Sequence, residues 1–340
     1  MRSAAPLDDP ISAPPRLALA VVVPASDAPP ALPTCIAALH AGDRAPDELV
    51  VQREPVGAGP AAARNAGALG VDADVIVFVD SDVEVHADAL TRIERRFQAD
   101  PDLAAVFGAY DDTPSASGLT SRFRNLLHHH VHASSPGEAE TFWAGLGAIR
   151  RDIFEAVGGF DAESFPLASV EDIELGMRLR ERGARVLLDP AIRGTHLKEW
   201  TPLTMVRTDF WRRGVPWARL LLRRGRGAAS LNLGRQHRAS AAATAVFAMA
   251  TLARRPRPAL ASLLVVVALN RGFYGLLLRR GGPRLLFAGV GLHLVHQLTA
   301  VAAAATAIVL HCRDRTGQML GMALSFRYAR KRRQAENLDG

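Results

Sequence analysis

The hydrophobic pattern of residues 17–190 alternates short apolar runs with amphipathic stretches. Val75–Val79 is a continuous run of β-branched and aromatic residues, which predicts a strand buried on both faces. Further strands are predicted at Leu17–Val23, Glu48–Val51, Val106–Tyr110 and Arg185–Leu188. Helices are predicted at Leu32–Ala41, Gly57–Gly70, Asp88–Gln98, Arg151–Val157 and from an N-cap at Ser169 to about Arg182. This alternation predicts an α/β domain with a mostly parallel sheet and helices on both faces.

After residue 200 the apolar segments become long enough to cross a membrane. Ala259–Leu278 contains 20 residues and Leu285–Leu310 contains 26, and about 20 apolar residues span a bilayer. Ser240–Ala253 is shorter and is predicted to be a third span or an interfacial helix. Trp200–Leu222 carries aromatic residues beside Arg, which is typical of helices at a membrane interface. Buried core helices remain the alternative for these segments.

These patterns divide the chain into five parts. Residues 1–15 are rich in Pro, Ala and Ser and predict a disordered arm. The α/β domain follows at 16–200, then interfacial helices at 201–238, two or three transmembrane helices at 239–312 and a basic tail at 313–340. The N-terminus lacks the charged start and apolar core of a signal peptide. We therefore expect a protein of the inner cell membrane with its α/β domain in the cytoplasm.

Charge is distributed unevenly between the two halves of the chain. Residues 191–340 carry 25 Lys and Arg against 5 Asp and Glu, whereas residues 1–190 carry 16 against 29. The Arg clusters of the basic half flank its hydrophobic segments, which indicates an anionic membrane surface as neighbour. Binding to nucleic acid is disfavoured because these residues do not line one polar face. Cys35 and Cys312 are far apart and indicate no disulfide framework or zinc site.

Two acidic residues follow the central strand. Asp80 and Asp82 come directly after Val75–Val79, at the sheet edge where open α/β folds bind ligands. Two carboxylates there are costly unless a positive partner meets them. A divalent ion that carries a diphosphate would supply the charge. An ordinary turn is the alternative for the Asp-Ser-Asp sequence alone.

Other residues of this half suggest ligand contacts. Arg64 stands near a predicted helix start, where a guanidinium can meet a phosphate, and Gly145 and Gly147 permit a close approach of backbone to ligand. Glu171 and Asp172 stand in the first turn of a predicted helix, where a carboxylate can serve as a general base. A solvated Arg and an ordinary acidic helix start are the alternatives.

A histidine cluster lies in the polar stretch 111–140. A metal site is conceivable there, but a loop or helix near the acceptor is the favoured interpretation. The cluster comprises His128, His129, His130 and His132.

In combination, these motifs resemble those of the inverting glycosyltransferases of family 2, which have the GT-A fold, in a membrane-attached form. The resemblance covers about residues 17–200 and occurs in the order and spacing of the family. The matching pieces are VVVPAS, Gly59–Gly67, VIVFVDSDVEV, Gly145–Asp161, Val170–Gly183 and His196.

The resemblance implies a role for each matching residue. Asp80 and Asp82 would hold the diphosphate of a nucleotide sugar through Mn²⁺ or Mg²⁺, with Asp82 as the more direct ligand and His196 completing the metal site. Asp172 would be the general base, with Glu171 beside it. The implied donor-binding residues are Pro24, Arg64, Asn65 and Asp80, and the implied acceptor-side residues are Trp143, Gly145, Leu146 and Gly147.

The end of the second strand departs from the family pattern. Gln52 and Glu54 stand near the place where family members have an acidic pair that reaches the nucleotide base. The predicted function is metal-dependent, inverting transfer of a hexose from a nucleotide sugar, and the membrane segments suggest a lipid-linked acceptor. The alternatives are a nucleotidyltransferase and a membrane-tethered nucleotide-sugar-binding protein without turnover.

Overall fold

The computed structural model describes residues 15–224 and 234–336, with side chains as far as residue 316. Nearly all of the arm predicted at residues 1–15 therefore lies outside the described residues. The side chains of most of the predicted basic tail lie outside them too.

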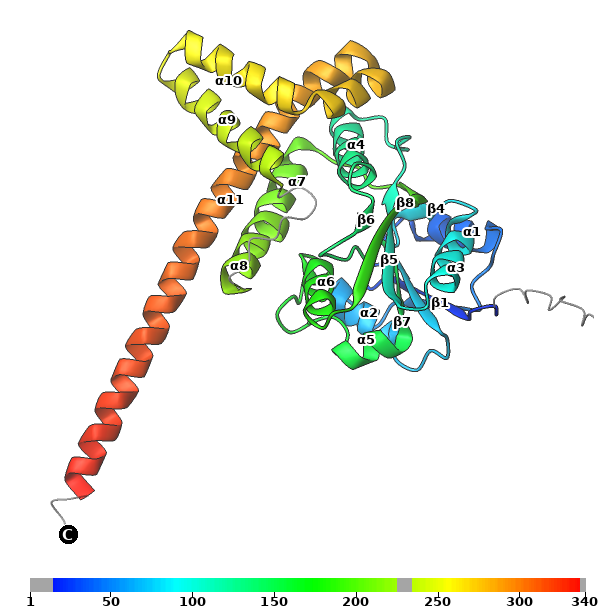
Figure 1. Cartoon of the computed structure of the whole chain (residues 1–340), viewed down its shortest axis with the longest axis horizontal. Coiled ribbons are helices and arrows are strands. Elements are labelled where there is room, and N and C mark those ends of the chain that lie inside the picture. The colour runs from blue at the N-terminus through cyan, green and yellow to red at the C-terminus, as the bar shows by residue number, and fades with distance from the viewer. Residues whose placement is uncertain (1–14, 225–233, 337–340) are drawn as a thin grey trace, which may run out of the picture.

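A mixed sheet of eight strands forms the centre of the first 200 residues (Figure 1). Its strands are β1 (Leu19–Pro24), β2 (Glu48–Gln52), β3 (Val75–Val79), β4 (Val83–Val85), β5 (Leu103–Tyr110), β6 (Gly137–Glu138), β7 (Leu146–Arg150) and β8 (Arg185–His196). Their order is β2-β1-β3-β7-β5-β8-β4, with β6 paired to β8. The predicted α/β class is confirmed. The sheet is mixed rather than mostly parallel because β7 enters between β3 and β5 in the opposite direction.

Helices cover both faces of the sheet, as predicted. One face packs on α1 (Leu32–Ala41) and α3 (Ala89–Ala99). The other packs on α2 (Pro60–Ala68), α5 (Arg151–Val157) and α6 (Glu171–Glu181). In β3, Val75, Val77 and Val79 enter the first core and Ile76 and Phe78 the second. Successive side chains of a strand point to opposite faces, which explains why this strand is apolar throughout.

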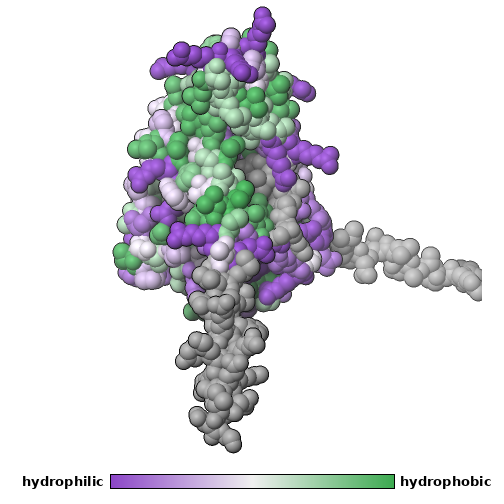
Figure 2. Space-filling model, turned by 90° about the vertical axis from the view of Figure 1, so that its left-hand side faces the viewer, coloured by the Kyte–Doolittle hydropathy of each residue, from purple (hydrophilic) through white to green (hydrophobic). Residues whose placement is uncertain are grey.

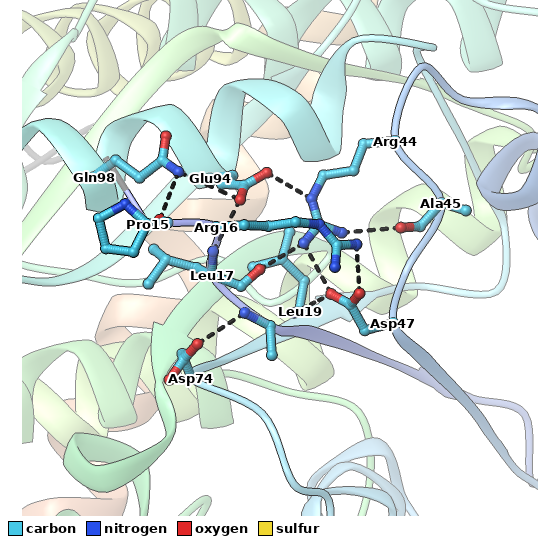
Figure 3. A network of polar contacts seen from close by, with 11 residues as sticks. Pro15, Arg16, Leu17, Leu19, Arg44, Ala45, Asp47, Asp74, Glu94 and Gln98 are labelled. Atoms are coloured by element: carbon cyan, nitrogen blue, oxygen red, sulfur yellow. Dashed lines mark hydrogen bonds and ion pairs between the residues drawn. The ribbon is translucent and has the colours of Figure 1, made fainter. Parts of the chain in front are cut away.

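A polar network anchors the chain where it enters β1 (Figure 3). The amide of Leu17 donates to Glu94 of α3 over 2.9 Å, and the amide of Leu19 donates to Asp47 over 2.8 Å. Arg44 donates to both carboxylates, over 2.6 Å to Glu94 and 2.8 Å to Asp47. These bonds tie β1 to its neighbours at the edge opposite the acidic turn.

The polar stretch 111–140 contains a helix, α4 (Leu119–Ala133), which joins the two halves of the molecule. Phe123 and Leu126 of α4 are fully buried in one apolar cluster with Phe273, Leu277 and Leu285. These last three belong to the C-terminal helix α11 (Arg271–Glu336). Because α4 also packs on β5, it links the α/β domain to the C-terminal helices.

The described residues of the C-terminal part form helices joined by short turns. This part comprises α7 (Pro202–Arg207), the π-helix η1 (Thr208–Gly214), α8 (Val215–Arg224), α9 (Arg235–Leu252), α10 (Pro256–Leu269) and α11. The helices α9 and α10 lie side by side as a hairpin (Figure 1). Helix α11 is interrupted at Gly282, whose φ of 65° favours glycine, directly before Pro283.

The two predicted membrane spans differ in the structure. Leu285–Leu310 lies within α11, but Ala259–Leu278 is not one helix, because α10 ends at Leu269 and Asn270 precedes the start of α11. Among the described residues, the segment Arg271–Thr316 is the one helix long and apolar enough to cross a membrane. The number of spans stays a prediction.

Exposed apolar side chains gather over α9, α10 and α11. Figure 2 shows them as a hydrophobic column with hydrophilic residues at its top and below it. The exposed apolar residues of these three helices include Val246, Met249, Leu260, Leu264, Val265, Phe287, Val295, Val301, Ile308 and Val309. A surface of this size and kind marks contact with an apolar partner or a membrane.

Candidate active site

The acidic turn after β3 lies between two other segments of the site. The amide of Asp80 donates to the carbonyl of Gly145 over 3.0 Å, and the amide of Leu197 donates to the carbonyl of Asp82 over 2.8 Å. The turn is thus fixed to the start of β7 on one side and to the end of β8 on the other. As a result, the backbone of Asp80 lies beside Gly145, and the carboxylate of Asp82 lies beside His196.

Asp82 and His196 are two of the three residues that sequence analysis assigned to a metal, and Asp80 is the third. Val83, next to Asp82, pairs with His196 across β4 and β8, and Nε2 of His196 lies 3.5 Å from Oδ2 of Asp82. Burial raises the pKa of Asp82, but the contact and charge of His196 and the charge of Lys198 outweigh it, so the pKa is lowered. Asp82 is therefore ionised at neutral pH.

The ligand types of this pair fit a divalent metal. Carboxylate oxygens suit Mg²⁺ and Mn²⁺, and an imidazole nitrogen favours a transition metal such as Mn²⁺ over Mg²⁺. Within the described residues there is no group of three or more His, Cys, Asp or Glu placed to hold a metal alone. A metal at Asp82 and His196 would thus need further ligands from outside this chain, such as diphosphate oxygens and water.

Arg64 joins the acidic turn to the start of α6. Its Nη2 lies 2.6 Å from Oδ1 of Asp80, and its Nη1 lies 3.0 Å from Oε1 of Glu171. The side chain is only 4% exposed, and the guanidinium lies over the ring of Phe160, 5.4 Å from its centroid. Burial alone would lower its pKa, but the charges of Asp80 and Glu171 raise it. The direct contact of Arg64 with a donor, predicted from the sequence, stays a prediction.

Asp172 is partly buried at the first turn of α6. Its Oδ2 accepts from the amide of Ala144 over 3.3 Å, and its Oδ1 accepts from the amide of Ile173 over 2.8 Å. Burial and the neighbouring charge of Glu171 raise its pKa to about 7, against the opposing effect of Arg64 and the two amides. A carboxylate with this pKa can accept a proton near neutral pH.

Ser169 is not the N-cap that was predicted for this helix. The N-cap is Val170, and no side chain caps the helix start. The hydroxyl of Ser169 donates to the carbonyl of Arg212 in η1 over 2.8 Å, and its amide donates to Glu171 over 2.8 Å. The hydroxyl thus binds a segment more than 40 residues away in sequence, which local capping rules do not consider.

The residues predicted to face an acceptor, Trp143 and Gly145 to Gly147, pack closely against one another. A Cβ at Gly145 would lie 2.4 Å from the Trp143 indole, and one at Gly147 would lie 2.3 Å from the Trp143 carbonyl oxygen. The two glycines therefore allow the chain to fold tightly on itself. Leu146 is fully buried in the core of the sheet, and its predicted place on the acceptor side stays a prediction.

Pro24 and Asn65 were also predicted to bind the donor. Pro24 ends β1, and the next amide, of Ala25, donates to the carbonyl of Gln52 over 2.8 Å. The side chain of Gln52 donates to the carbonyl of Glu54. Both polar atoms of the Asn65 amide bond to the backbone of Phe160, over 2.8 and 2.9 Å. Asn65 therefore braces the loop under Arg64, and its contact with a donor stays a prediction.

The histidines of α4 form part of an aromatic cluster. The ring of His128 lies 4.0 Å from His132, 4.3 Å from Tyr110 and 4.7 Å from Trp143 between centroids. Burial lowers the pKa of His128 and that of His132, so both rings are neutral at pH 7. The favoured interpretation, a helix near the acceptor segment, agrees with this packing against Trp143.

Sequence analysis missed one residue of the site, Asn125. Its amide oxygen lies 2.6 Å from Nδ1 of His196. Asn125 stands in the middle of α4, 71 residues before its partner. No motif marks it, because its role depends on where α4 packs.

The chain is similar to known glycosyltransferases over most of its length. Residues 25–311 match the model of glycosyl transferase family 21. The pre-mycofactocin glycosyltransferase of Mycobacterium tuberculosis, from strains CDC 1551 / Oshkosh and H37Rv, is 29% identical over 171 residues. That alignment covers 45% of this chain and 34% of the relative, so the chain spans about a third of the length of the curated relatives it matches.

A solved structure shows the same fold. The mannosyltransferase PcManGT from Pyrobaculum calidifontis, in complex with GDP-Man and Mn²⁺, is 15% identical and has a TM-score of 0.50. The alignment covers 86% of this chain and 87% of that chain. The predicted GT-A fold is thereby confirmed. Assignment to family 2 is not confirmed, since the matching model is that of family 21.

Proposed function

The chain belongs to glycosyl transferase family 21, and we propose that it transfers a hexose from a nucleotide sugar by a metal-dependent, inverting reaction at a membrane. The family favours sugar transfer over the nucleotidyltransferase alternative. The observation that carries the proposal is the placement of Asp172. Its carboxylate lies beside Ala144, and Arg64 joins the neighbouring Glu171 to the acidic turn at Asp80.

At the donor end, Asp82 and His196 would hold a divalent metal. When bound, that metal neutralises charge that develops on the leaving diphosphate. Asp80, the third residue predicted to hold the metal, is paired with Arg64 over 2.6 Å. The mannosyltransferase of the same fold was solved with GDP-Man and Mn²⁺, and we extend a nucleotide sugar and Mn²⁺ or Mg²⁺ to this chain as part of the proposal.

At the acceptor end, Asp172 would accept the proton of the acceptor hydroxyl as that oxygen attacks the anomeric carbon. Attack from the face opposite the diphosphate breaks the bond from carbon to diphosphate oxygen in the same step, and the anomeric configuration inverts. Glu171 is held by Arg64 over 3.0 Å and by the amide of Ser169 over 2.8 Å. Asp172 is therefore the carboxylate we assign as base.

The membrane part of the proposal rests on the C-terminal helices. The segment Arg271–Thr316 is long and apolar enough to cross a bilayer, and apolar side chains are exposed along α9, α10 and α11 (Figure 2). We propose that the α/β domain lies at the cytoplasmic face of the inner membrane. An acceptor linked to a lipid would reach the site there.

Two substitutions test the assignment of donor and acceptor ends. Asp172→Asn should keep Mn²⁺-dependent binding of nucleoside diphosphates but lose transfer by about 10²-fold or more. Asp82→Asn should lose the Mn²⁺ dependence of that binding. Glu84→Gln, an exposed neighbour on β4, is the control and should change neither. Calorimetry with a panel of nucleoside diphosphates, and transfer from labelled sugar nucleotides, measure the two effects.

Two results would reject this proposal. The first is transfer that survives in Asp172→Asn. The second is a product whose anomeric proton coupling shows retention of the donor configuration.

A further inference from the structure

We propose that Asn125 is a positioning residue that fixes the ring of His196 and its tautomer, and so sets the metal affinity of the site. This inference rests on the proposed function, because it concerns the metal that Asp82 and His196 would hold. It adds a residue that lies on a different element from either of those two.

The hydrogen bond of Asn125 determines which nitrogen of His196 faces Asp82. Oδ1 of Asn125 lies 2.6 Å from Nδ1 of His196, and an amide oxygen can only accept. In the neutral ring, the proton is therefore on Nδ1, and Nε2 presents its lone pair. That lone pair faces Oδ2 of Asp82 at 3.5 Å. A carboxylate oxygen and an imidazole lone pair are both acceptors, so a divalent cation between them would satisfy both, as it does between two ligands of one metal.

Tyr110 restricts the same ring in the other direction. The rings of Tyr110 and His196 are stacked, with centroids 4.3 Å apart and planes 10° from parallel. Stacking holds the plane of the imidazole, and the bond to Asn125 holds its rotation within that plane. Both restraints are needed to direct Nε2 at one point.

The amide group of Asn125 is a costly choice for its position. Asn125 is 2% exposed, and its Nδ2 has no hydrogen-bond partner within the described part of the chain. An unpaired buried donor costs about 1–3 kcal/mol. A leucine would fill a similar volume without this cost. The contact of the amide oxygen with His196 is the gain that offsets it.

The helix that carries Asn125 is itself fixed on its far side. Arg124, the preceding residue, lies 2.7 Å from Asp209 of η1, and Asp209 lies 2.7 Å from His296 of α11. Asn125 thus contacts the proposed metal ligand His196, and its neighbour Arg124 contacts Asp209, which is paired with α11. The position of His196 therefore depends on how α4 packs against the C-terminal helices.

The test measures Mn²⁺ binding to the full chain in detergent, by the electron paramagnetic resonance signal of free Mn²⁺, with and without inorganic pyrophosphate. Asn125→Leu should weaken Mn²⁺ binding about 10- to 100-fold, the usual effect of losing a partner of a ligating histidine. Asn125→Asp keeps an acceptor oxygen and should stay within about threefold of the parent. If the leucine variant does not fold, Asn125→Ala removes the same acceptor without added bulk.

A matched control separates this role from general stability. Asn270 is also a buried asparagine, and it donates to Ser240 over 2.7 Å among the C-terminal helices. Asn270→Leu should lower the unfolding temperature and leave Mn²⁺ affinity unchanged. Parent-like Mn²⁺ affinity in Asn125→Leu overturns the inference, and so does an equal loss in Asn125→Leu and Asn125→Asp. Unchanged affinity in His196→Ala would instead reject the proposed metal role of His196.

Discussion

The guanidinium of Arg64 contacts the carboxylate of Asp80 over 2.6 Å, although the two residues lie on different sides of β3 in sequence. The same guanidinium reaches Glu171, which directly precedes Asp172. Arg64 therefore sets the spacing between the proposed metal end and the proposed base. Its planar fork of donors is the feature that permits one side chain to hold two carboxylates.

We expect Arg64→Lys to fail as a substitute. A single ammonium cannot keep both contacts, and a buried carboxylate that loses its partner costs about 3–5 kcal/mol. The variant should unfold at a lower temperature and transfer sugar slowly. Differential scanning fluorimetry and a transfer assay measure the two effects. Arg95→Lys, on the exposed face of α3, serves as the control. Parent-like stability and transfer in Arg64→Lys would show that the bridge is dispensable.

The transfer rate should rise with pH around neutrality. Asp172 acts as base only when ionised, and its pKa is raised to about 7. The value of kcat/KM should therefore increase tenfold per pH unit below about pH 6 and level off above about pH 8. A steady-state profile at saturating Mn²⁺ measures this. A rate that is flat from pH 5 to pH 8 would contradict the assignment of Asp172.

Asp172→Asn should stabilise the protein at high pH. The folded-state pKa of about 7 exceeds the ordinary value of 3.8, so the stability that protonated Asp172 contributes is lost as pH rises from about 4 through 7. Asparagine resembles the protonated carboxyl and avoids that loss. The unfolding temperature of the variant should exceed that of the parent by a few degrees at pH 8 and by less at pH 5. A lower unfolding temperature of the variant at pH 8 would refute this.

Asp209→Asn should loosen the joint between the α/β domain and α11. Burial would raise the pKa of Asp209, but Arg124 and His296 lower it strongly, so its contribution to stability is present above the usual Asp pKa and lost as pH falls below it. The substitution leaves Arg124 buried without its carboxylate, at a cost of about 3–5 kcal/mol. Thermal unfolding between pH 3 and pH 8 measures the effect.

A matched control for Asp209 is available at the same joint. Asp112 also forms an ion pair with α11, through Arg280, but that pair is more exposed, with 25% and 43% of the two side chains accessible. Exposed pairs contribute about 0–1 kcal/mol, so Asp112→Asn should change stability little. Equal effects of the two substitutions would mean that burial does not decide the strength of this joint.

Gly145→Ala should impair transfer more than stability. The added Cβ would lie 2.4 Å from the Trp143 indole, so the indole must move, and with it the segment beside Ala144 and Asp172. Tryptophan fluorescence and transfer kinetics should both change. Gly291→Ala in α11, where nothing lies within 4 Å of the new atom, is the control. Unchanged transfer in Gly145→Ala would remove this segment from the acceptor side.

Local sequence pattern predicted the elements that carry the acidic turn. Val75–Val79 was recognisable because a strand buried on both faces must be apolar throughout, and the carboxylates that follow it had no core role. The direction of β7 was not recognisable, because a short apolar run has the same composition in either direction. The pattern of the stretch 111–140 does not distinguish a loop from a helix, because histidines and arginines of α4 interrupt its apolar period.

Contacts between residues distant in sequence could not be predicted, for a different reason. The pairing of Arg64 with Glu171 spans 107 residues, and that of Asn125 with His196 spans 71. Nothing in the pattern around either residue specifies its partner. The predicted span Ala259–Leu278 failed as a single helix because average hydropathy hides Asn270, where the chain turns between α10 and α11. Motif order did identify the GT-A fold, although it did not separate family 2 from family 21.

The apolar cluster between α4 and α11 has a practical consequence for anyone who shortens this chain. Cutting after residue 224 would leave Phe123, Leu126 and Leu127 without the side chains of Phe273, Leu277 and Leu285 that cover them. A fragment of this kind would expose an apolar patch on α4, the helix that also carries Asn125 of the candidate active site. We therefore expect the α/β domain expressed alone to aggregate, which would prevent an assay of its activity.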